Sequence, residues 1–370
     1  MRKIGWILLS PRTDPQPSTR IAALNMMDEL PARGYASVVL YEPVNGSEQP
    51  RLPPTAELLE TVRREQIELV IFQKAHGPSI LEFIDALRRA GVKTAYMVCD
   101  LVLPVMTEAT DLTITVTPYL RSLYPEALRH KVEIVHDGIE RAELCKDGAD
   151  RPPGRSATRL SATLVTSAAL YDLGPIGRPP DWLSVNVVGR YPAARAPLHR
   201  LKNAYQALAV LPDARARLDF LRFAMHPRIR TQAWSEAGAY AALLDADVGI
   251  IPVREEGEAT ADGRPPMWMR KSENRLTMKM ALGLPVVASP VPAYLDIIEQ
   301  GVNGFIASST AEWRSCLEAL RDPALRRSVG ARARQTVAQR YSRTRQAELL
   351  AAALDRQLGA PPDQAATQST

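Results

Sequence analysis

The sequence is poor in cysteine and in aromatic residues, and it has no long apolar run. Its three cysteines, Cys99, Cys145 and Cys316, lie far apart, and none belongs to a CxxC motif or a Cys/His cluster. This spacing supports neither a disulfide framework nor a zinc site, and it fits a reducing cytoplasm. Aromatic residues make up 6% of the chain and do not alternate with basic residues, so nothing requires a nucleic-acid partner. No apolar stretch approaches the ~20 residues of a membrane span.

Several motifs that carry well-known chemistries are also missing. No GxGxxG follows the first expected strand, which disfavours a dinucleotide oxidoreductase. There is no GxxxxGK[ST] loop of a P-loop NTPase and no GxSxG elbow of a hydrolase. No dense group of Asp and His residues is present, so we expect neither a bound metal nor a resident cofactor.

The composition is that of a folded globular protein with a mild positive charge. Hydrophobic residues account for 46% of the chain and charged residues for 24%, and the formal net charge is +5. Such a charge suits an anionic ligand or an acidic membrane surface. Arg2 and Lys3 precede the apolar run Ile4–Leu9 as in a signal peptide, but Ser10 and Pro11 end the run too early. We therefore expect a buried first strand and a cytoplasmic protein, with peripheral contact at the inner face of the membrane left open.

Short apolar runs alternate with amphipathic stretches along the chain, a pattern typical of parallel α/β sheets. In the first half, it predicts strands at Ile4–Leu9, Ala36–Tyr41, Leu69–Gln73, Lys93–Cys99, Leu112–Val116 and Val132–Val135. It also predicts helices at Thr19–Arg33, Thr55–Gln66 and Ser79–Ala90, with Ser18 as the N-cap of the first helix.

The alternation restarts after a polar stretch that contains Pro-Pro-Gly. The expected strands there are Ala162–Ser167, Leu183–Val188, Leu218–Ala224, Ala246–Pro252 and Pro285–Ser289. The expected helices are Ala239–Leu244, Asn274–Leu282, Ala311–Leu320, Asp322–Tyr341 and Arg343–Leu358.

The pattern predicts an α/β fold with two facing doubly wound Rossmann-like domains and an interdomain cleft. We place an N-terminal acceptor-binding domain at 1–145, a linker at 146–159 and a C-terminal nucleotide-sugar-binding domain at 160–342. The helix at 343–358 is expected to pack back on the N-terminal domain, and the polar tail at 359–370 is expected to be disordered.

The segment from Trp234 to Tyr341 holds several motifs in a recognisable order. They are DADVGIIP at 245–252, MALGLPVVAS at 280–289, GVNGF at 301–305, the pair Glu312-Trp313, DPALR at 322–326 and the pair Tyr341-Ser342. In order and spacing, these motifs resemble the donor-binding half of retaining GT-B glycosyltransferases, in particular the large family 4. The resemblance implies the GT-B arrangement, a nucleotide-sugar donor and a metal-independent reaction.

The resemblance is looser in the first half. Ser18-x-Arg20 opens the first helix as in the family, and His136-Asp137-Gly138 stands where the family commonly has an Asn-Gly turn. The family's glycine-rich first loop is replaced by the sequence SPRTDP at 10–15. We expect Arg12, Ser18 and Arg20 to contribute to acceptor binding, with Arg12 and Arg20 facing an anionic acceptor or the donor phosphates.

Physical chemistry supports a donor site at the start of the helix before Gly283. A helix start offers free N–H groups and the positive end of a dipole, which suit a diphosphate. Lys271 and Arg275 are four residues apart, so in a helical turn they would share a face and neutralise the phosphates. The donor-binding candidates are Arg190, Arg254, Lys271, Ser272, Glu273, Asn274 and Arg275.

The segment departs from the family at two acidic positions. Many members carry two glutamates eight residues apart, and here Arg270 and Met278 occupy those positions. Lys271 and Arg275 fit a subgroup with Lys-x-x-x-Lys in their place. Glu273 is close enough in sequence to substitute for a missing glutamate.

Two polar residues at expected strand ends of the first half are catalytic candidates. His76 follows the strand Leu69–Gln73, and Asp100 follows Lys93–Cys99. Either side chain could polarise a donor or acceptor hydroxyl.

Together, these features predict a retaining hexosyltransferase. It would move a sugar from a nucleotide diphosphate to a hydroxyl of a glycan, lipid-linked glycan or small molecule, in glycan or glycoconjugate biosynthesis. Two alternatives stay open: a nucleotide-sugar epimerase, and a catalytically inactive GT-B-like binding subunit.

Overall fold

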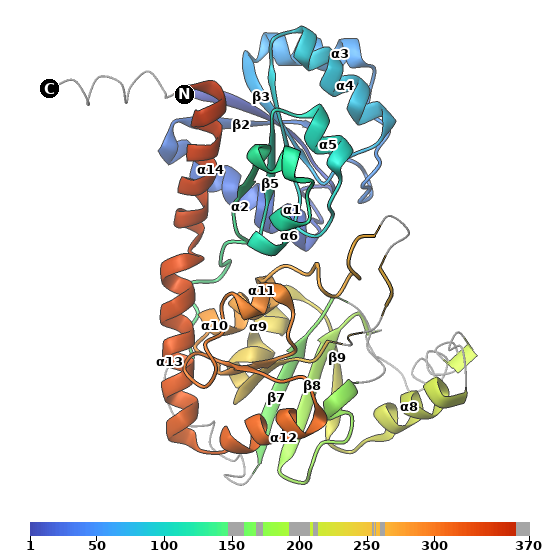
Figure 1. The fold of residues 1–370 in the computed structure, drawn as a ribbon, viewed down its shortest axis with the longest axis vertical. Coiled ribbons are helices and arrows are strands. Elements are labelled where there is room, and N and C mark those ends of the chain that lie inside the picture. Colours follow the sequence, from blue (N-terminus) through green and yellow to red (C-terminus); the bar gives the residue numbers. More distant parts are fainter. Residues whose placement is uncertain are drawn as a thin grey trace, which may run out of the picture. The chain divides into compact units, whose positions relative to one another are not determined.

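The structure is a computed structural model (Figure 1). It describes residues 1–146, 159–167, 173–191, 208–209, 214–253, 255, 257–259 and 263–359. The chain forms two compact units, each built around one parallel sheet. The first unit comprises Met1–Glu140, Gly257–Asn274 and Arg340–Thr370, and the second comprises Arg141–Glu256 and Arg275–Gln339. None of the helices in the described ranges has the length and apolar character that crossing a membrane demands.

The first sheet has six parallel strands in the order β2-β1-β3-β4-β5-β6. The strands are β1 (Arg2–Ile7), β2 (Tyr35–Tyr41), β3 (Ile67–Gln73), β4 (Lys93–Met97), β5 (Leu112–Thr115) and β6 (Val132–Ile134). Each strand that the sequence predicts in this half is present, with small shifts at its ends.

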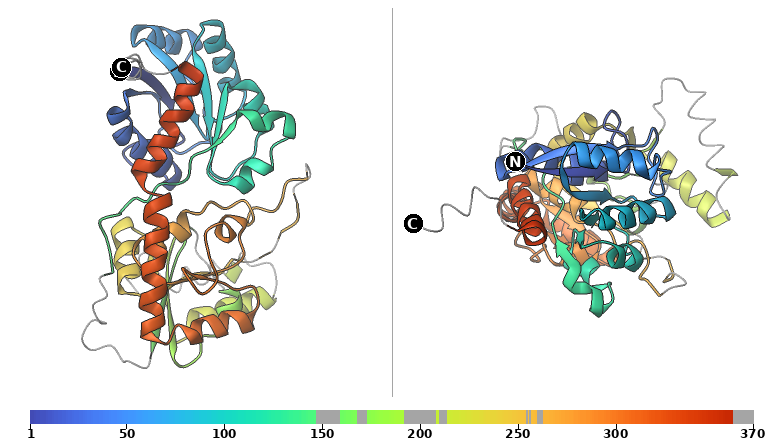
Figure 2. Two further views of the ribbon diagram at one scale, coloured as in Figure 1. Left: turned by 60° about the vertical axis from the view of Figure 1, so that its left-hand side comes forward. Right: turned by 90° about the horizontal axis from the view of Figure 1, so that it is seen from above.

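Helices cover both faces of the first sheet because apolar residues line both sides of its central strands. Within β1, Ile4 and Trp6 pack toward α2 (Asn25–Glu29) and α14 (Arg343–Leu358), whereas Ile7 packs toward α3 (Thr55–Arg64) and α4 (Pro78–Arg89). This alternation follows from the two-residue period of a strand. A second view shows α14 lying along the sheet (Figure 2). The remaining helices of the unit are α1 (Pro17–Thr19), α5 (Pro104–Ala109), α6 (Pro118–Ser122), the 3₁₀ segments η2 (Leu30–Arg33) and η3 (Glu126–Lys131), and the π-helical segment η1 (Arg20–Leu24).

The first helical run differs from its prediction in two details. It starts at Pro17, two residues before Thr19, and Gln16 rather than Ser18 is the residue before its first turn, so the prediction of Ser18 as N-cap is wrong. Pro17 takes the first helical position, where its missing N–H costs nothing. The run also widens into a π-helix over Arg20–Leu24, a feature that often marks functional sites.

The second sheet also has six parallel strands, in the order β12-β11-β10-β7-β8-β9. They are β7 (Leu160–Val165), β8 (Leu183–Gly189), β9 (Ile229–Ala233), β10 (Val248–Ile251), β11 (Val286–Ala288) and β12 (Phe305–Ile306). The helices are α8 (Ala214–Met225), α9 (Glu236–Asp245), α10 (Asn274–Ala281), α11 (Pro292–Leu295), α12 (Thr310–Ala319) and α13 (Pro323–Arg340), with a 3₁₀ turn η4 (Gly174–Ile176). The α/β class with two doubly wound sheets is thus confirmed.

One predicted strand of the second half is wrong. The segment Leu218–Ala224 lies inside helix α8 instead. Phe220 and Phe223 are buried three residues apart, while Leu218 is exposed, and this spacing is that of one helix face. The third strand on this side is β9, an edge strand whose exposed Arg230 and Thr231 weaken its apolar signal.

The unit limits differ from the predicted domains by a few residues at 141–145 and 340–342, and by one longer segment. Residues 257–274 pack with the first unit, although the sequence placed them within the C-terminal domain. Arg264 Nη1 donates to the carbonyl of Val102 at 2.8 Å, and Arg270 Nη1 donates to that of Asp100 at 3.3 Å. These contacts tie the segment to the loop that follows β4.

A close approach between α13 and the turn after α10 fixes the packing of the second unit. Gly283 has a φ of +77°, which ends α10 in the left-handed conformation that glycine favours. Gly330 of α13 lies against that turn, and a Cβ added to Gly330 would stand 2.1 Å from the carbonyl oxygen of Gly283. The helix can therefore approach only because Gly330 has no side chain.

We expect Gly330→Ala to lower the free energy of unfolding by about 1–3 kcal/mol, the cost of overpacking. At an exposed position of a helix, a glycine-to-alanine change would instead stabilise the protein by ~1 kcal/mol. The sign of the stability change therefore tells whether Gly330 lies in a close contact. Urea denaturation measures the difference. Ser328→Ala on the exposed side of α13 is the control and should change stability by less than about 0.5 kcal/mol. A Gly330→Ala protein as stable as the wild type would contradict the close approach.

Candidate functional site

The first sheet has its topological switch point between β1 and β3. The chain leaves β1 toward β2 on one side and returns to β3 on the other, and ligands of such sheets bind at the carboxyl ends of these strands. A buried polar network occupies this edge. The side chain of Gln73 accepts hydrogen bonds from the amide of Leu9 at 3.1 Å and from the hydroxyl of Thr19 at 3.0 Å. Ser10 Oγ donates to Thr19 Oγ1 at 2.9 Å, which ties the loop after β1 to the first helical run.

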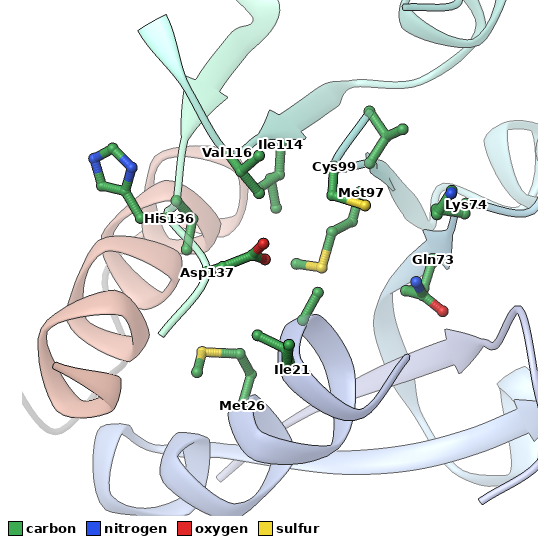
Figure 3. Close-up of a pocket in the computed structure, with 13 residues that line it drawn as sticks. Ile21, Met26, Gln73, Lys74, Met97, Cys99, Ile114, Val116, His136 and Asp137 are labelled. Atoms are coloured by element: carbon green, nitrogen blue, oxygen red, sulfur yellow. The ribbon is translucent and has the colours of Figure 1, made fainter. Parts of the chain in front are cut away.

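A small cavity lies beside this network (Figure 3). Its volume is about 20 Å³, room for roughly one water molecule. Methionine, isoleucine and valine side chains form much of its wall, and the carboxyl group of Asp137 points into it while the ring of His136 points away. Gln73, Lys74 and Cys99 supply further polar atoms to the lining.

Lys74 is held in an unusual backbone conformation at the end of β3. Its φ is +57°, in the left-handed region that costs a non-glycine residue energy. Its amine pairs with Asp100 Oδ1 at 2.8 Å and Glu48 Oε1 at 3.1 Å. Burial opposes the charge of Lys74, but the nearby Asp100 and Glu48 carboxylates outweigh it and raise the pKa of the amine. The catalytic candidate Asp100 is therefore the partner of a buried cation.

A pair of buried carboxyl groups lies at the end of β6. The Glu273 side chain is 1% exposed, and its Oε1 accepts hydrogen bonds from His136 Nδ1 at 3.1 Å and from the amide of Asp137 at 3.2 Å. The other oxygen, Oε2, is buried without a hydrogen-bond partner among the described residues. Burial, and then the charge of Glu273, raise the pKa of Asp137 to about 7, although Ser272 donates a hydrogen bond to it. Asp137 can thus hold or release a proton near neutral pH.

This cluster joins three distant parts of the first unit. The amide of His136 donates to Gln346 of α14 at 2.9 Å, and the His136 ring lies edge-on to Tyr341 at 4.7 Å between centroids. Gln346 is fully buried and donates in turn to the carbonyl of Arg340 at 2.8 Å. The site therefore depends on residues separated by more than two hundred positions in the sequence.

The second sheet has its switch point between β7 and β10. Helix α10 connects β10 to β11, so it runs antiparallel to both strands and starts at their carboxyl edge. Arg275 lies in the first turn of α10, and its Nη2 stands 3.5 Å from Ser167 Oγ, just beyond the end of β7. A helix start and an arginine thus meet where ligands of such sheets bind.

The expected helical pairing of Lys271 with Arg275 is wrong. Helix α10 begins at Asn274, so Lys271, Ser272 and Glu273 precede it and the four-residue spacing does not place Lys271 and Arg275 on one helix face. Lys271 also packs with the first unit, whereas Arg275 belongs to the second.

The other candidates of the first unit have local partners. Arg12 is exposed and forms a two-pronged ion pair with Glu42, both contacts being 3.1 Å. Arg20, in the π-helical segment, pairs in the same way with Glu140 at 2.6 and 3.0 Å. His76 Nδ1 lies 3.1 Å from the carbonyl of Lys74.

The remaining candidates lie at the second sheet or beyond the described ranges. Arg190 is exposed directly after β8. Arg254 lies outside the described residues. The roles assigned to the candidate residues stay predictions.

Sequence reasoning missed the residues that build the strongest electrostatic features. Lys74 lies two residues before the catalytic candidate His76. His136 and Asp137 lie in the turn that the sequence analysis compares with an Asn-Gly turn. Burial was the missing information, because a sequence pattern does not show that Asp137 and Glu273 share an interior.

We expect Asp137→Asn to change how stability depends on pH. The folded chain keeps the Asp137 proton to about pH 7, whereas a free aspartate has a pKa of 3.8, so the folded state binds more protons between these values. Wild-type stability must therefore fall as pH rises across this window, by on the order of a few kcal/mol, and the asparagine variant lacks this contribution. Urea denaturation from pH 5 to pH 8 tests this, with the exposed Asp14→Asn as control. Parallel profiles for the wild type and Asp137→Asn would refute the shifted carboxyl group.

Comparison with known proteins points to one class. Residues 267–352 match a family model described as "Glycosyl transferase-like". No curated protein sequence matches the chain. Among solved structures, it is similar to the Anabaena protein HepE in complex with UDP-glucose, with 12% identity, a TM-score of 0.62, and coverage of 96% of this chain and 100% of HepE.

Two further structures agree. A glycosyltransferase from Rickettsia africae has 11% identity and a TM-score of 0.69, with 97% of this chain and 99% of that one covered. Sucrose-phosphate synthase from Thermosynechococcus elongatus has 14% identity and a TM-score of 0.64, with the same coverage. Over nearly its whole length, the chain has the fold of GT-B glycosyltransferases, as the sequence motifs predict.

Proposed function

We propose that the chain is a glycosyltransferase that moves a sugar from a nucleotide-diphosphate-sugar donor to an acceptor hydroxyl. The observation that carries the proposal is the glycosyl transferase-like match over residues 267–352. This segment contains the start of α10, which lies at the switch point of the second sheet. Retention of configuration follows from the resemblance to retaining enzymes, and a role in glycan or glycoconjugate synthesis is part of the proposal.

The donor diphosphate is assigned to the carboxyl edge of the second sheet. The start of α10 supplies N–H donors and the positive end of the helix dipole. Arg275 supplies a guanidinium that can bind a phosphate through two hydrogen bonds, and Arg190 stands after the neighbouring strand β8. These groups can stabilise the charge that develops on the departing nucleoside diphosphate, so the proposed reaction does not call for a resident metal ion.

The acceptor is assigned to the first unit, where the carboxyl edge carries groups that can take or hold a proton. Asp100 and His76 lie beyond β4 and β3, and Asp137 holds a proton up to about pH 7. We propose that Glu273 acts by holding the ring of His136 and the amide of Asp137, since its side chain is only 1% exposed.

A binding subunit without catalytic activity is the second candidate. It is favoured by the two positions at which many relatives carry glutamate. Arg270 at the first is buried and donates to the carbonyls of Pro265 and Asp100, and Met278 at the second has no charge. Such a protein would bind a nucleotide sugar without consuming it. A nucleotide-sugar epimerase, the other alternative, would convert the donor without an acceptor.

The first test is a thermal-shift screen against nucleotide sugars, followed by calorimetry with the matching nucleoside diphosphate. We expect Arg275→Ala to weaken diphosphate binding by about 1–3 kcal/mol, the value of a charged hydrogen bond. Arg222→Ala, at an exposed position of α8, is the control and should leave affinity unchanged.

Product analysis with the donor found in the screen separates the candidates. Sugar transfer to an added acceptor supports the transferase, and an altered free nucleotide sugar supports the epimerase. Binding without turnover of any donor supports the inactive subunit. If Arg275→Ala leaves the affinity unchanged, the diphosphate site is not where we place it.

A further inference from the structure

Helix α10 carries a lysine in the interior of the second unit. The side chain of Lys279 is 0% exposed, and lysine is almost never fully buried unless its charge is paired. Its Nζ donates to the carbonyl oxygen of Arg275, one turn earlier in the helix, at 2.8 Å. No carboxylate contact to Lys279 is present among the described residues. The amine is thus buried directly below the turn to which we assign the diphosphate.

The neighbouring strand makes room for this side chain. Gly249 of β10 faces Lys279, and a Cβ added to Gly249 would lie 2.8 Å from Lys279 Cδ and 3.3 Å from its Cβ and Cγ. A larger residue at 249 would therefore displace the lysine. The glycine and the lysine form a matched pair, in which the aliphatic part of Lys279 fills the space over the strand.

Among the described residues, the charge that acts on Lys279 is cationic. Arg275 acts on it from its own helix. On α13, Arg334 donates to the carbonyl of Ala281, at the other end of α10, and Lys146 donates to the carbonyl of Ala246 before β10. The adjacent strands β10 and β11 consist of apolar residues and glycine. Burial, and then Arg275, lower the pKa of Lys279 to about 7. Near neutral pH, the amine is therefore close to the midpoint of its titration.

We propose that Lys279 is a positioning residue that couples the binding of a diphosphate at the start of α10 to the uptake of one proton. The inference rests on the proposed function, because the anion must bind there. In the free protein, the amine is largely neutral above neutral pH. A bound diphosphate offsets the positive charge of Arg275 and of the helix start, so the buried amine takes a proton from solvent and becomes an ammonium group. The ammonium then adds its charge to the end of the helix that holds the phosphates.

The sign of the pH effect follows from this cycle. Since the bound state holds more protons than the free state above about pH 7, affinity must fall as pH rises through the range between the two pKa values. If binding takes up one full proton, the affinity falls by about tenfold for each unit that the pH rises. The probe must not titrate itself, so we choose an intact nucleotide sugar, whose phosphates lack the ionisation near pH 6 of a terminal phosphate.

The experiment is calorimetry with the tightest-binding nucleotide sugar of the screen, in buffers of different ionisation enthalpy, from pH 6.5 to pH 8.5. For the wild type, we expect an uptake of about 0.4 proton or more at pH 7.5, and an affinity that falls several-fold between pH 7 and pH 8.5. Lys279→Met keeps the aliphatic bulk but has no amine, so it should bind with no proton uptake and with an affinity independent of pH. Lys146→Met, which removes another lysine of the same unit, should keep the wild-type uptake.

The outcomes separate the two proposals. Binding by the wild type without proton uptake, or uptake that persists in Lys279→Met, overturns the role of Lys279 and leaves the proposed function standing. Failure of every nucleotide sugar to bind overturns both. If Lys279→Met does not fold, Lys279→Gln serves as the second variant, and the wild-type proton count alone still decides whether a proton is taken up. A lysine that only filled space would leave this count at zero.

Discussion

Hydrogen bonding between parallel strands determines where this chain can carry out chemistry. In each unit, the carboxyl ends of six parallel strands lie at one edge of the sheet. The strand order reverses at one point of that edge, and a crevice for ligands forms at such a switch point. In the first unit, Gln73 and Thr19 meet there, and in the second, Arg275 meets Ser167. These residues are far apart in sequence, and only the sheet brings them together. A change that shifted β1 or β7 in register would therefore disperse the site and disturb the core together.

Buried polar groups then give the first edge its specific structure. Lys74 and Glu273 are both nearly inaccessible, and such groups are costly unless they are paired. Lys74 meets two carboxylates, and Glu273 meets a histidine ring and a backbone amide. Each pairing joins segments from different parts of the chain. In the described part of residues 257–274, polar contacts of Arg264, Arg270 and Glu273 hold the segment against the first unit.

The sequence predicts the architecture well because the signals of its elements are local. The strand predicted at Leu69–Gln73 begins with four apolar residues in a row, and such a run needs only a few neighbouring residues to be recognised. The prediction was wrong where local and tertiary preferences diverge. Leu218–Ala224 combines aromatic and apolar residues typical of strands, but Phe220 and Phe223 are buried on one helix face. Edge strand β9 was missed because its exposed residues carry no apolar alternation.

The site was less predictable because its properties arise from burial. Arg275 could be singled out, since a basic residue at a helix start has a sequence signal. The raised pKa of Asp137 could not, since it depends on exclusion of water and on the charge of Glu273. The sequence does not predict the burial of Lys279 either, because a lysine within an amphipathic helix normally lies at the surface. Its complement, Gly249, lies thirty positions away and carries no signal of its own.

The departures from the resembled family point to one change in recognition. Residues 270–279 hold four cationic side chains and one acidic one, where many relatives carry two glutamates. Arg270 is engaged by backbone carbonyls, and Glu273 by His136 and an amide, so both side chains have partners within the protein. If the chain binds a nucleotide sugar, this segment therefore contributes mainly to holding the phosphates. Every nucleotide-diphosphate sugar carries the same diphosphate, so cationic groups that bind it do not distinguish one sugar from another. Selection of the sugar must then come from other residues.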